Sequence, residues 1–190
     1  MQPRLKSFLT AAFLLTSLGL CAQEDYHSRN RDLLARLSYE SSPVVRREGV
    51  RHICVSVNRE GEYRIVRSPQ EGQTQRLQGR LSSEQMKQIE MLLGSDDFRN
   101  LSGSHGGLIL QEAESFGAEI GRREDETQRL QWLNADGKNP FPASVAKVID
   151  WLKHFEPTNG KSFVYAEYPD VCPAGGLRLL QPTVAANQHP

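Results

Sequence analysis

Hydrophobic and polar residues alternate along two parts of the chain, and each part predicts a β-hairpin. In the first part, residues 52–58 alternate strictly, with His52 and Cys54 together on the more polar face. The apolar face carries Ile53, Val55 and Val57. A glycine-containing turn leads to a returning strand at residues 63–67, and residues 74–79 are consistent with a third strand.

The second alternating part begins with residues 115–121 and continues with residues 128–134. Between them, the charged residues 122–127 predict the turn of a second hairpin. Phe116 and Trp132 belong to the apolar faces of these two strands. Residues 102–107, with the sequence SGSHGG, are typical of a flexible loop.

Two segments carry apolar residues at helical spacing. The first is predicted at residues 83–93, with Ser82 as N-cap and Gln85 completing a reciprocal capping box. Gly94 is expected to end this helix in a left-handed conformation. The second helix is predicted at residues 143–155. The apolar faces contain Met86, Ile89, Leu92 and Leu93 in the first helix, and Val145, Val148, Ile149, Leu152 and Phe155 in the second.

The predicted fold is α+β, a single domain over residues 50–182. An antiparallel sheet, built from the two hairpins and a late strand at 163–168, packs against both amphipathic helices on one face. The leucine cluster at 33–37 makes residues 23–49 an N-terminal arm or short helix. Residues 183–190 are expected to be a disordered tail.

The first 22 residues have the pattern of a secretory signal peptide. Arg4 and Lys6 precede an apolar run at residues 8–20, which is shorter than the roughly 20 residues of a membrane-spanning helix. Cleavage after Ala22 would deliver an exported protein to the periplasm or the extracellular space. A second interpretation makes Cys21 the lipid-bearing residue of a lipobox, although Leu20 departs from that pattern.

Composition narrows the classes of function. About 168 residues remain after cleavage, which fits one domain with a real core. Their 21 basic and 23 acidic residues leave a net charge of −2 without a basic stripe, so the sequence favours neither nucleic acid nor a membrane surface as partner. Cys54 and Cys172 are then the remaining cysteines. In an oxidising compartment they either pair as a disulfide or stay as buried thiols.

Candidate chemistry is sparse. Ser104 and His105 are adjacent in the glycine-rich loop, but the nucleophile-elbow pattern is missing around the serine. Asp96 and Asp97 are a second candidate, as a pair of catalytic carboxylates, but adjacent acidic residues after a helix are usually solvated surface groups. The histidines do not follow metal-ligand spacing, and the sequence contains neither a phosphate loop nor a dinucleotide fingerprint, so we expect neither a metal nor a cofactor. The two tryptophans, at positions 132 and 151, are candidates for a ligand groove, but core packing explains their spacing more simply.

The layout of residues 51–155 resembles small exported bacterial proteins of unassigned function. It is also similar, more loosely, to emfourin-type inhibitors of metallopeptidases. The matching features are the two hairpins, the helix opened by residues 81–85, the pair Asp97-Phe98 and the closing amphipathic helix. The arm, the late strand and the two cysteines depart from that pattern. The resemblance implies a compact non-catalytic binder and transfers no inhibitory residue.

We therefore expect an exported binding domain with a protein partner, and an extracellular peptidase as the specific candidate. Ser104, His105, Arg122 and Arg123 are the predicted interaction residues, because they lie in a loop and a turn. The rival interpretation is a small secreted hydrolase that uses His105 or the Asp96–Asp97 pair. A third is an envelope protein anchored through a lipid on Cys21.

Overall fold

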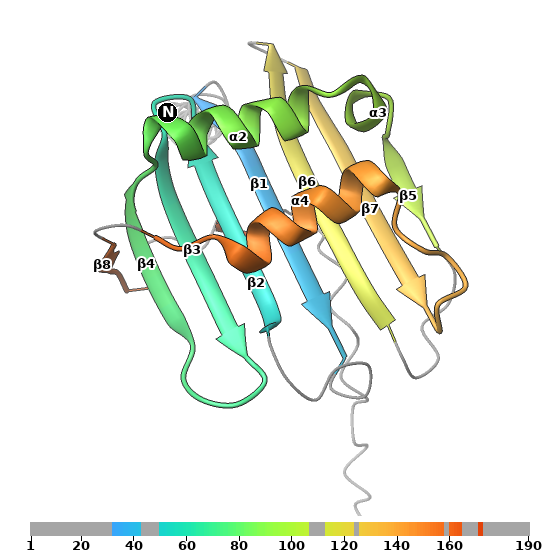
Figure 1. Cartoon of the computed structure of the whole chain (residues 1–190), viewed down its shortest axis with the longest axis horizontal. Helices are drawn as coiled ribbons and strands as arrows, with labels where there is room; N and C mark the ends of the chain where they lie inside the picture. Colours follow the sequence, from blue (N-terminus) through green and yellow to red (C-terminus); the bar gives the residue numbers. More distant parts are fainter. Residues whose placement is uncertain are drawn as a thin grey trace, which may run out of the picture.

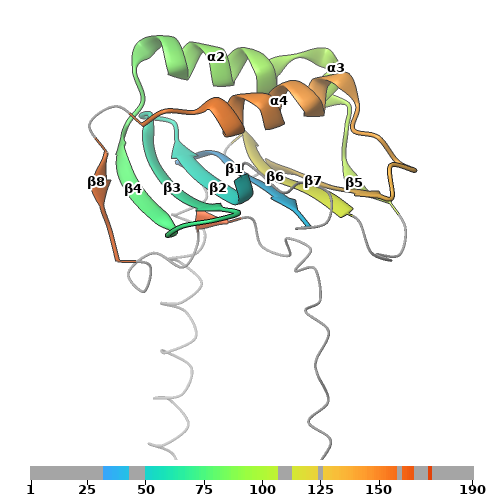
Figure 2. The same cartoon turned by 60° about the horizontal axis from the view of Figure 1, so that its bottom comes forward.

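In the part of the chain that the structure describes, eight strands form one sheet, and two long helices lie together on one of its faces (Figures 1 and 2). The computed structural model describes residues 32–42, 50–106, 113–123, 126–157, 160–164 and 171–172. The predicted signal peptide, Cys21 and the predicted tail lie outside the described residues. The prediction of a single α+β domain with an antiparallel sheet and helices on one face is confirmed.

The sheet has the strand order β5-β7-β6-β1-β2-β3-β4-β8. The strands are β1 Leu33–Ser41, β2 Val50–Asn58, β3 Glu62–Pro69, β4 Gln75–Arg80, β5 Gly103–His105, β6 Ala113–Arg123, β7 Glu126–Ala135 and β8 Lys161–Ser162. The helices are α2 Ser83–Gly94, α3 Asp96–Arg99 and α4 Ala143–His154. Both predicted hairpins, β2–β3 and β6–β7, are confirmed, as is the third strand β4.

The prediction of an N-terminal arm or short helix at residues 23–49 is wrong for the described part of that segment, because Leu33–Ser41 forms the central strand β1. This strand pairs antiparallel with β2 on one side and with β6 on the other. Residues at odd positions from Leu33 to Ser41 are buried, and those between them are half-buried. Leu34 obscured this alternation in the sequence. The domain therefore includes β1, which joins the two hairpins into one sheet.

The glycine-rich segment 102–107 also differs from its predicted loop structure. Residues Gly103–His105 form the short strand β5, which pairs in parallel with β7 at the edge of the sheet. This is the parallel pairing in an otherwise antiparallel arrangement of the described strands. The backbone of β7, which pairs with β6 on its other side, supplies the hydrogen-bonding partner of β5, and the sequence pattern did not show this pairing.

The predicted capping box of α2 is confirmed. The amide of Gln85 donates to the Ser82 hydroxyl at 3.1 Å, and the amide of Ser82 donates to the Gln85 side chain at 2.9 Å. The end of the helix differs from the prediction. Gly94 is the last helical residue, and its backbone is not left-handed. The residue after it, Ser95, is extended and forms the C-cap. The hydroxyl of Ser95 donates to the Leu92 carbonyl at 2.9 Å and completes the last turn.

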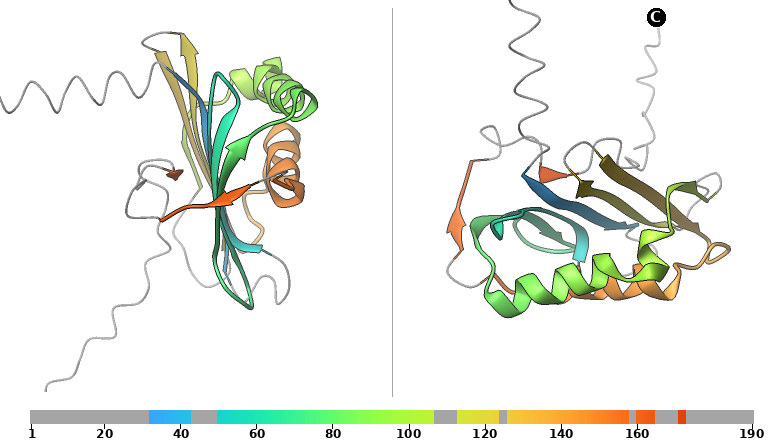
Figure 3. Two further views of the ribbon diagram at one scale, coloured as in Figure 1. Left: turned by 90° about the vertical axis from the view of Figure 1, so that its left-hand side faces the viewer. Right: turned by 90° about the horizontal axis from the view of Figure 1, so that it is seen from above.

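The main core lies between the helices and the sheet (Figure 3). Ile89 and Ile149 are buried as expected, whereas Trp132 is only half-buried near the β5 edge. The largest side chains enclosed in this core are Leu37, Tyr39, Ile53, Ile65, Ile89, Leu93, Phe98, Phe116, Ile120, Leu130 and Leu152. Burial of this apolar surface from both hairpins and both helices is the principal stabilising contribution.

A smaller cluster lies on the opposite face of the sheet. Cys54 of β2 forms a disulfide with Cys172, with their Cα atoms 5.1 Å apart. Around it pack Val66, Phe163 and Val171. The late strand lies earlier than predicted: it is the two-residue β8, which pairs with β4. Of the predicted strand at 163–168, residues 163 and 164 are not in a strand, and residues 165–168 lie outside the described part. The disulfide joins the C-terminal part of the chain to the centre of the sheet.

Candidate functional site

The outer surface of the helix pair contains a groove of about 750 Å³. Helices α2 and α4 run antiparallel, because the Gln85 side chain at the start of α2 donates to the Glu156 carbonyl just beyond α4, at 3.1 Å. Figures 1 and 2 show the two helices side by side across the strands. Concave sites of this volume are within the range of ligand and peptide pockets.

Met91 is the most exposed large hydrophobic residue of the described chain, at 64% of its surface. Its position follows from helix geometry. Ile89 and Leu93 point into the core, and a residue two positions from each lies on the far side of the helix. Leu92, half-buried beside it, continues the apolar lining of the groove. A flexible methionine adapts its shape to different partner surfaces.

Trp151 provides the opposite wall of the groove. Val148 and Leu152 turn toward the core, which leaves the neighbouring Trp151 half-buried at the border of the groove. Its ring stacks on Phe155 with centroids 5.1 Å apart. The two stacked rings give this wall of the groove an aromatic surface. Both interpretations of the tryptophans describe Trp151, which packs against the main core and also lines the groove.

The rim of the groove has mixed charge. On α4, Lys147 and Asp150 are exposed. The Oδ1 atom of Asp150 lies 3.1 Å from the Nδ1 atom of His154, one turn later. On α2, the rim carries the neutral amides of Gln85 and Gln88. Such a rim attracts neither strongly acidic nor strongly basic ligands, so recognition at this groove would depend on apolar contact and shape.

The predicted pair Ser104 and His105 lies at the β5 edge, away from this groove. The His105 ring stacks on Trp132 with centroids 4.4 Å apart, and one ring nitrogen lies 2.9 Å from the Ser102 carbonyl. Ser104 instead donates to the Gln131 side chain at 3.3 Å. Within the described residues, the two side chains do not hydrogen-bond to each other. Ser104 and His105 are therefore not joined in the nucleophile–base contact of a serine hydrolase.

Asp96 and Asp97 occupy the first turn of α3, where both are exposed. Negative charge is favourable at the N-terminus of a helix, which gives these carboxylates a structural explanation. They lie at the end of α2 and do not line the groove. Their surroundings do not supply the low-dielectric cleft that usually distinguishes a catalytic acid from a catalytic base.

The predicted turn at residues 122–127 is too long, because Arg122 and Arg123 are the last two residues of β6 and β7 already begins at Glu126. Arg122 donates to the Leu93 carbonyl at 2.9 Å and also to the side chain of Gln128. Burial lowers the pKa of Arg122, with Arg99 adding a smaller effect in the same direction. Arg123 is exposed. Arg122 thus supports the fold, and the contact of either arginine with a partner stays a prediction.

A second, more polar pocket of about 480 Å³ lies across β2, β3, β4 and β8. Arg64, Arg80 and Lys161 line it together with Glu62. Glu62 and Arg80 form an exposed ion pair at 3.7 Å, so part of the positive charge is compensated locally. This pocket offers weaker apolar contact than the helix groove.

Comparison with protein-family models, curated proteins and solved structures finds no match to this chain. The emfourin-type resemblance therefore stays a prediction. Sequence reasoning missed the groove itself, although one signal was available. Met91 is an apolar residue outside the apolar stripe of its helix, and such a residue has no packing role in a two-layer core.

Proposed function

We propose that this protein is an exported, non-catalytic domain that binds a partner protein through the groove between α2 and α4. The observation that carries the proposal is the exposure of Met91, 64%, within a concave apolar groove walled by Trp151. Exposed apolar surface in a soluble domain costs solubility, and its concentration in one concavity is typical of binding surfaces.

The proposed occupant is one amphipathic helix of the partner. The groove lies between two antiparallel helices of 12 residues each, and a third helix packs into such a groove as it does in a helical bundle. An apolar stripe on the partner would contact Met91, Leu92 and Trp151. Its polar flanks would meet Gln88 on one side and the charged residues of α4 on the other.

The hydrolase alternative has less support. Its candidate residues, His105 and the Asp96–Asp97 pair, belong to different elements and do not line the groove. The described part of the chain holds no helix long and apolar enough to cross a membrane. Export rests on the signal-peptide pattern, and a disulfide is compatible with an oxidising compartment. A lipid on Cys21 would change the anchorage of the protein and leave this binding mode intact.

The resemblance to metallopeptidase inhibitors makes a secreted peptidase the first partner to test. Purified protein is immobilised, exposed to the medium or periplasm of its own host, and the bound proteins are identified. Met91→Asp places a charge in the groove. Val164→Asp is the matched control, because Val164 is 62% exposed and lies outside the groove.

We expect one partner to bind the wild type and the Val164→Asp variant alike, and to lose at least tenfold in affinity with Met91→Asp. Both variants should melt within a few degrees of the wild type, since neither side chain is in the core. Equal binding by both variants would refute the groove. Hydrolysis of a peptide, ester or glycoside panel that disappears with His105→Ala would refute the non-catalytic assignment.

A further inference from the structure

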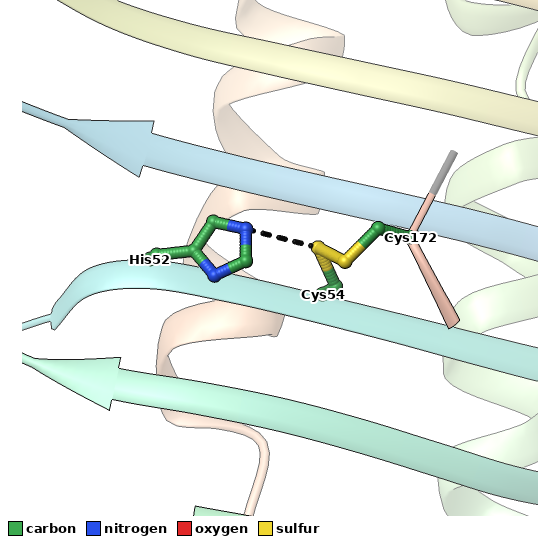
Figure 4. A group of neighbouring side chains, drawn as sticks. All are labelled: His52, Cys54 and Cys172. Atoms are coloured by element: carbon green, nitrogen blue, oxygen red, sulfur yellow. Dashed lines mark hydrogen bonds between the residues drawn. A yellow bond between two sulfur atoms is a disulfide. The ribbon is translucent and has the colours of Figure 1, made fainter. Parts of the chain in front are cut away.

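Three metal-ligating side chains meet on the face of the sheet opposite the helices (Figure 4). His52 and Cys54 are two residues apart on β2, so their side chains point to the same face. The Nε2 atom of His52 lies 3.2 Å from the Sγ atom of Cys54. Cys172 reaches this point from the other end of the chain, and the three ligand atoms lie within 4.8 Å of one another.

The surroundings of the cluster restrict its access to solvent. Cys54 is completely buried beside Val66 and Val171, whereas His52 and Cys172 are half-buried. The antiparallel register places Glu40 of β1 opposite His52. The cluster therefore lies in a partly closed apolar environment with one side open to water.

We propose that His52, Cys54 and Cys172 form a zinc site that becomes available when their disulfide is reduced. The ligands would be the Nε2 atom of His52 and the Sγ atoms of both cysteines. Two thiolates and one imidazole are a ligand set that Zn²⁺ accepts, with water in the fourth position. The proposal is independent of the groove, because α2 and α4, which line the groove, cover the other face of the sheet.

The chemistry has two steps. A thiol reductant supplies two electrons to the bond between Cys54 and Cys172, each sulfur takes up one proton, and the reductant becomes a disulfide. Zn²⁺ then replaces the two thiol protons, which are released to solvent, and the neutral His52 ring supplies the third ligand. Thiol–disulfide exchange with a partner disulfide, which takes up the two electrons and two protons and becomes two thiols, would restore the bond between Cys54 and Cys172 and expel the ion.

The required movement is small. Two sulfurs are about 2 Å apart in a disulfide and about 3.7 Å apart around a tetrahedral zinc ion. The sulfurs must therefore separate by about 1.7 Å, which side-chain rotation of the half-exposed Cys172 can provide. The Nε2 atom of His52 and the Sγ atom of Cys54 are 3.2 Å apart, which is already close enough for both atoms to bind one zinc ion.

The test uses the exported protein without a histidine tag, in oxidised form and after anaerobic reduction and removal of the reductant. Co²⁺ is the spectroscopic probe, because thiolate coordination gives an intense near-ultraviolet charge-transfer band and tetrahedral geometry gives visible bands. Zn²⁺ is then titrated in competition, and bound metal is measured by elemental analysis. The variants are His52→Ala, Cys172→Ser and, as matched control, His154→Ala.

We expect the reduced wild type and His154→Ala to bind one equivalent of Co²⁺ with both sets of bands, and Zn²⁺ to displace it. The oxidised protein should show no thiolate band. His52→Ala should weaken binding at least tenfold, since it removes one of three ligands. Zn²⁺ should also raise the melting temperature of the reduced wild type, and should do so less with His52→Ala.

Three results would overturn the proposal. The first is the absence of a charge-transfer band in the reduced wild type. The second is equal affinity of the His52→Ala and His154→Ala variants, which would indicate thiol binding without a site. The third is a reduced protein that circular dichroism shows to be unfolded and that Zn²⁺ does not refold.

Discussion

Arg122 of β6 donates a hydrogen bond from its guanidinium to the carbonyl of Leu93, in the last turn of α2, at 2.9 Å. Helix α2 has no basic residue of its own in that turn. The positive charge that favours a helix C-terminus is therefore supplied by the sheet. This contact joins β6, a strand of the second hairpin, to α2, which follows β4 in the chain.

Replacement of Arg122 by alanine should lower the free energy of unfolding by about 1–3 kcal/mol, because the Leu93 carbonyl and the Gln128 side chain lose a charged donor. Denaturant titration followed by circular dichroism measures the change. Arg123→Ala is the control, since the neighbouring arginine is exposed and should alter stability by less than about 0.5 kcal/mol. Equal effects of the two substitutions would contradict the structural role of Arg122.

The sequence predicts the parts of this fold whose patterns are local. Alternation in β2 and capping at Ser82 identify a hairpin and a helix without reference to the rest of the chain. Strand β1 was missed because Leu33, Leu34 and Leu37 are also compatible with one side of a helix. Its true partners are β2 and β6, and a pairing with β6, more than 70 residues away, leaves no local mark.

The candidate sites show the same division. The strand pattern places His52 and Cys54 on one face of β2, but the arrival of Cys172 depends on the path of the C-terminal segment. Met91 could be recognised from the sequence as an apolar residue outside its stripe. The groove that Met91 lines is formed by the antiparallel approach of α2 and α4, which the sequence does not specify.

Reduction of the disulfide should destabilise the protein strongly. Cys54 and Cys172 are 118 positions apart in the sequence, and closing so long a loop contributes about 4–5 kcal/mol in the chain-entropy model. Guanidinium unfolding with and without a phosphine reductant, in the presence of a chelator, measures the difference. A Cys54→Ala/Cys172→Ala variant should not respond to the reductant. Free alkylation of both thiols in the unreduced exported protein would contradict the bridge.

Acid should destabilise the protein through His52. Burial lowers the pKa of His52 from 6.5, and the nearby Arg51 acts in the same direction. The folded state thus binds this proton less readily than the unfolded state, so the stabilising contribution of neutral His52 is complete above pH 6.5. It is lost as the pH falls from there through the lower pKa of the folded state.

The half-buried Glu40 opposite His52 has the reverse sign, because partial burial raises the pKa of Glu40 from 4.5 against the smaller, lowering effect of Arg51. The comparison of His52→Gln with the wild type separates the two groups. The wild type should lose more unfolding free energy than His52→Gln between about pH 8 and about pH 5.5, with the disulfide intact and a chelator present. Parallel pH profiles for the two proteins would contradict the assignment to His52.

Two glycines should respond to alanine in opposite directions. Gly121 lies in β6 beside an irregularity in its pairing with β7, and a Cβ atom there would be 2.1 Å from the carbonyl oxygen of Leu33. That oxygen belongs to the backbone of β1, so relief requires the two central strands to move apart. Gly121→Ala should therefore cost about 1–3 kcal/mol, as overpacking does in a core.

Gly94, the last residue of α2, is the matched case without a steric cost. A Cβ atom at Gly94 meets nothing within 4 Å, and its backbone is not left-handed. Alanine restricts the unfolded chain more than glycine does, so Gly94→Ala should stabilise the protein by about 0.4–1 kcal/mol. Denaturant midpoints for both variants, at an unchanged slope, give the two signs in one experiment. Destabilisation by Gly94→Ala would show that the chain needs a glycine at the end of α2, and tolerance of Gly121→Ala would refute the close approach of β1 and β6.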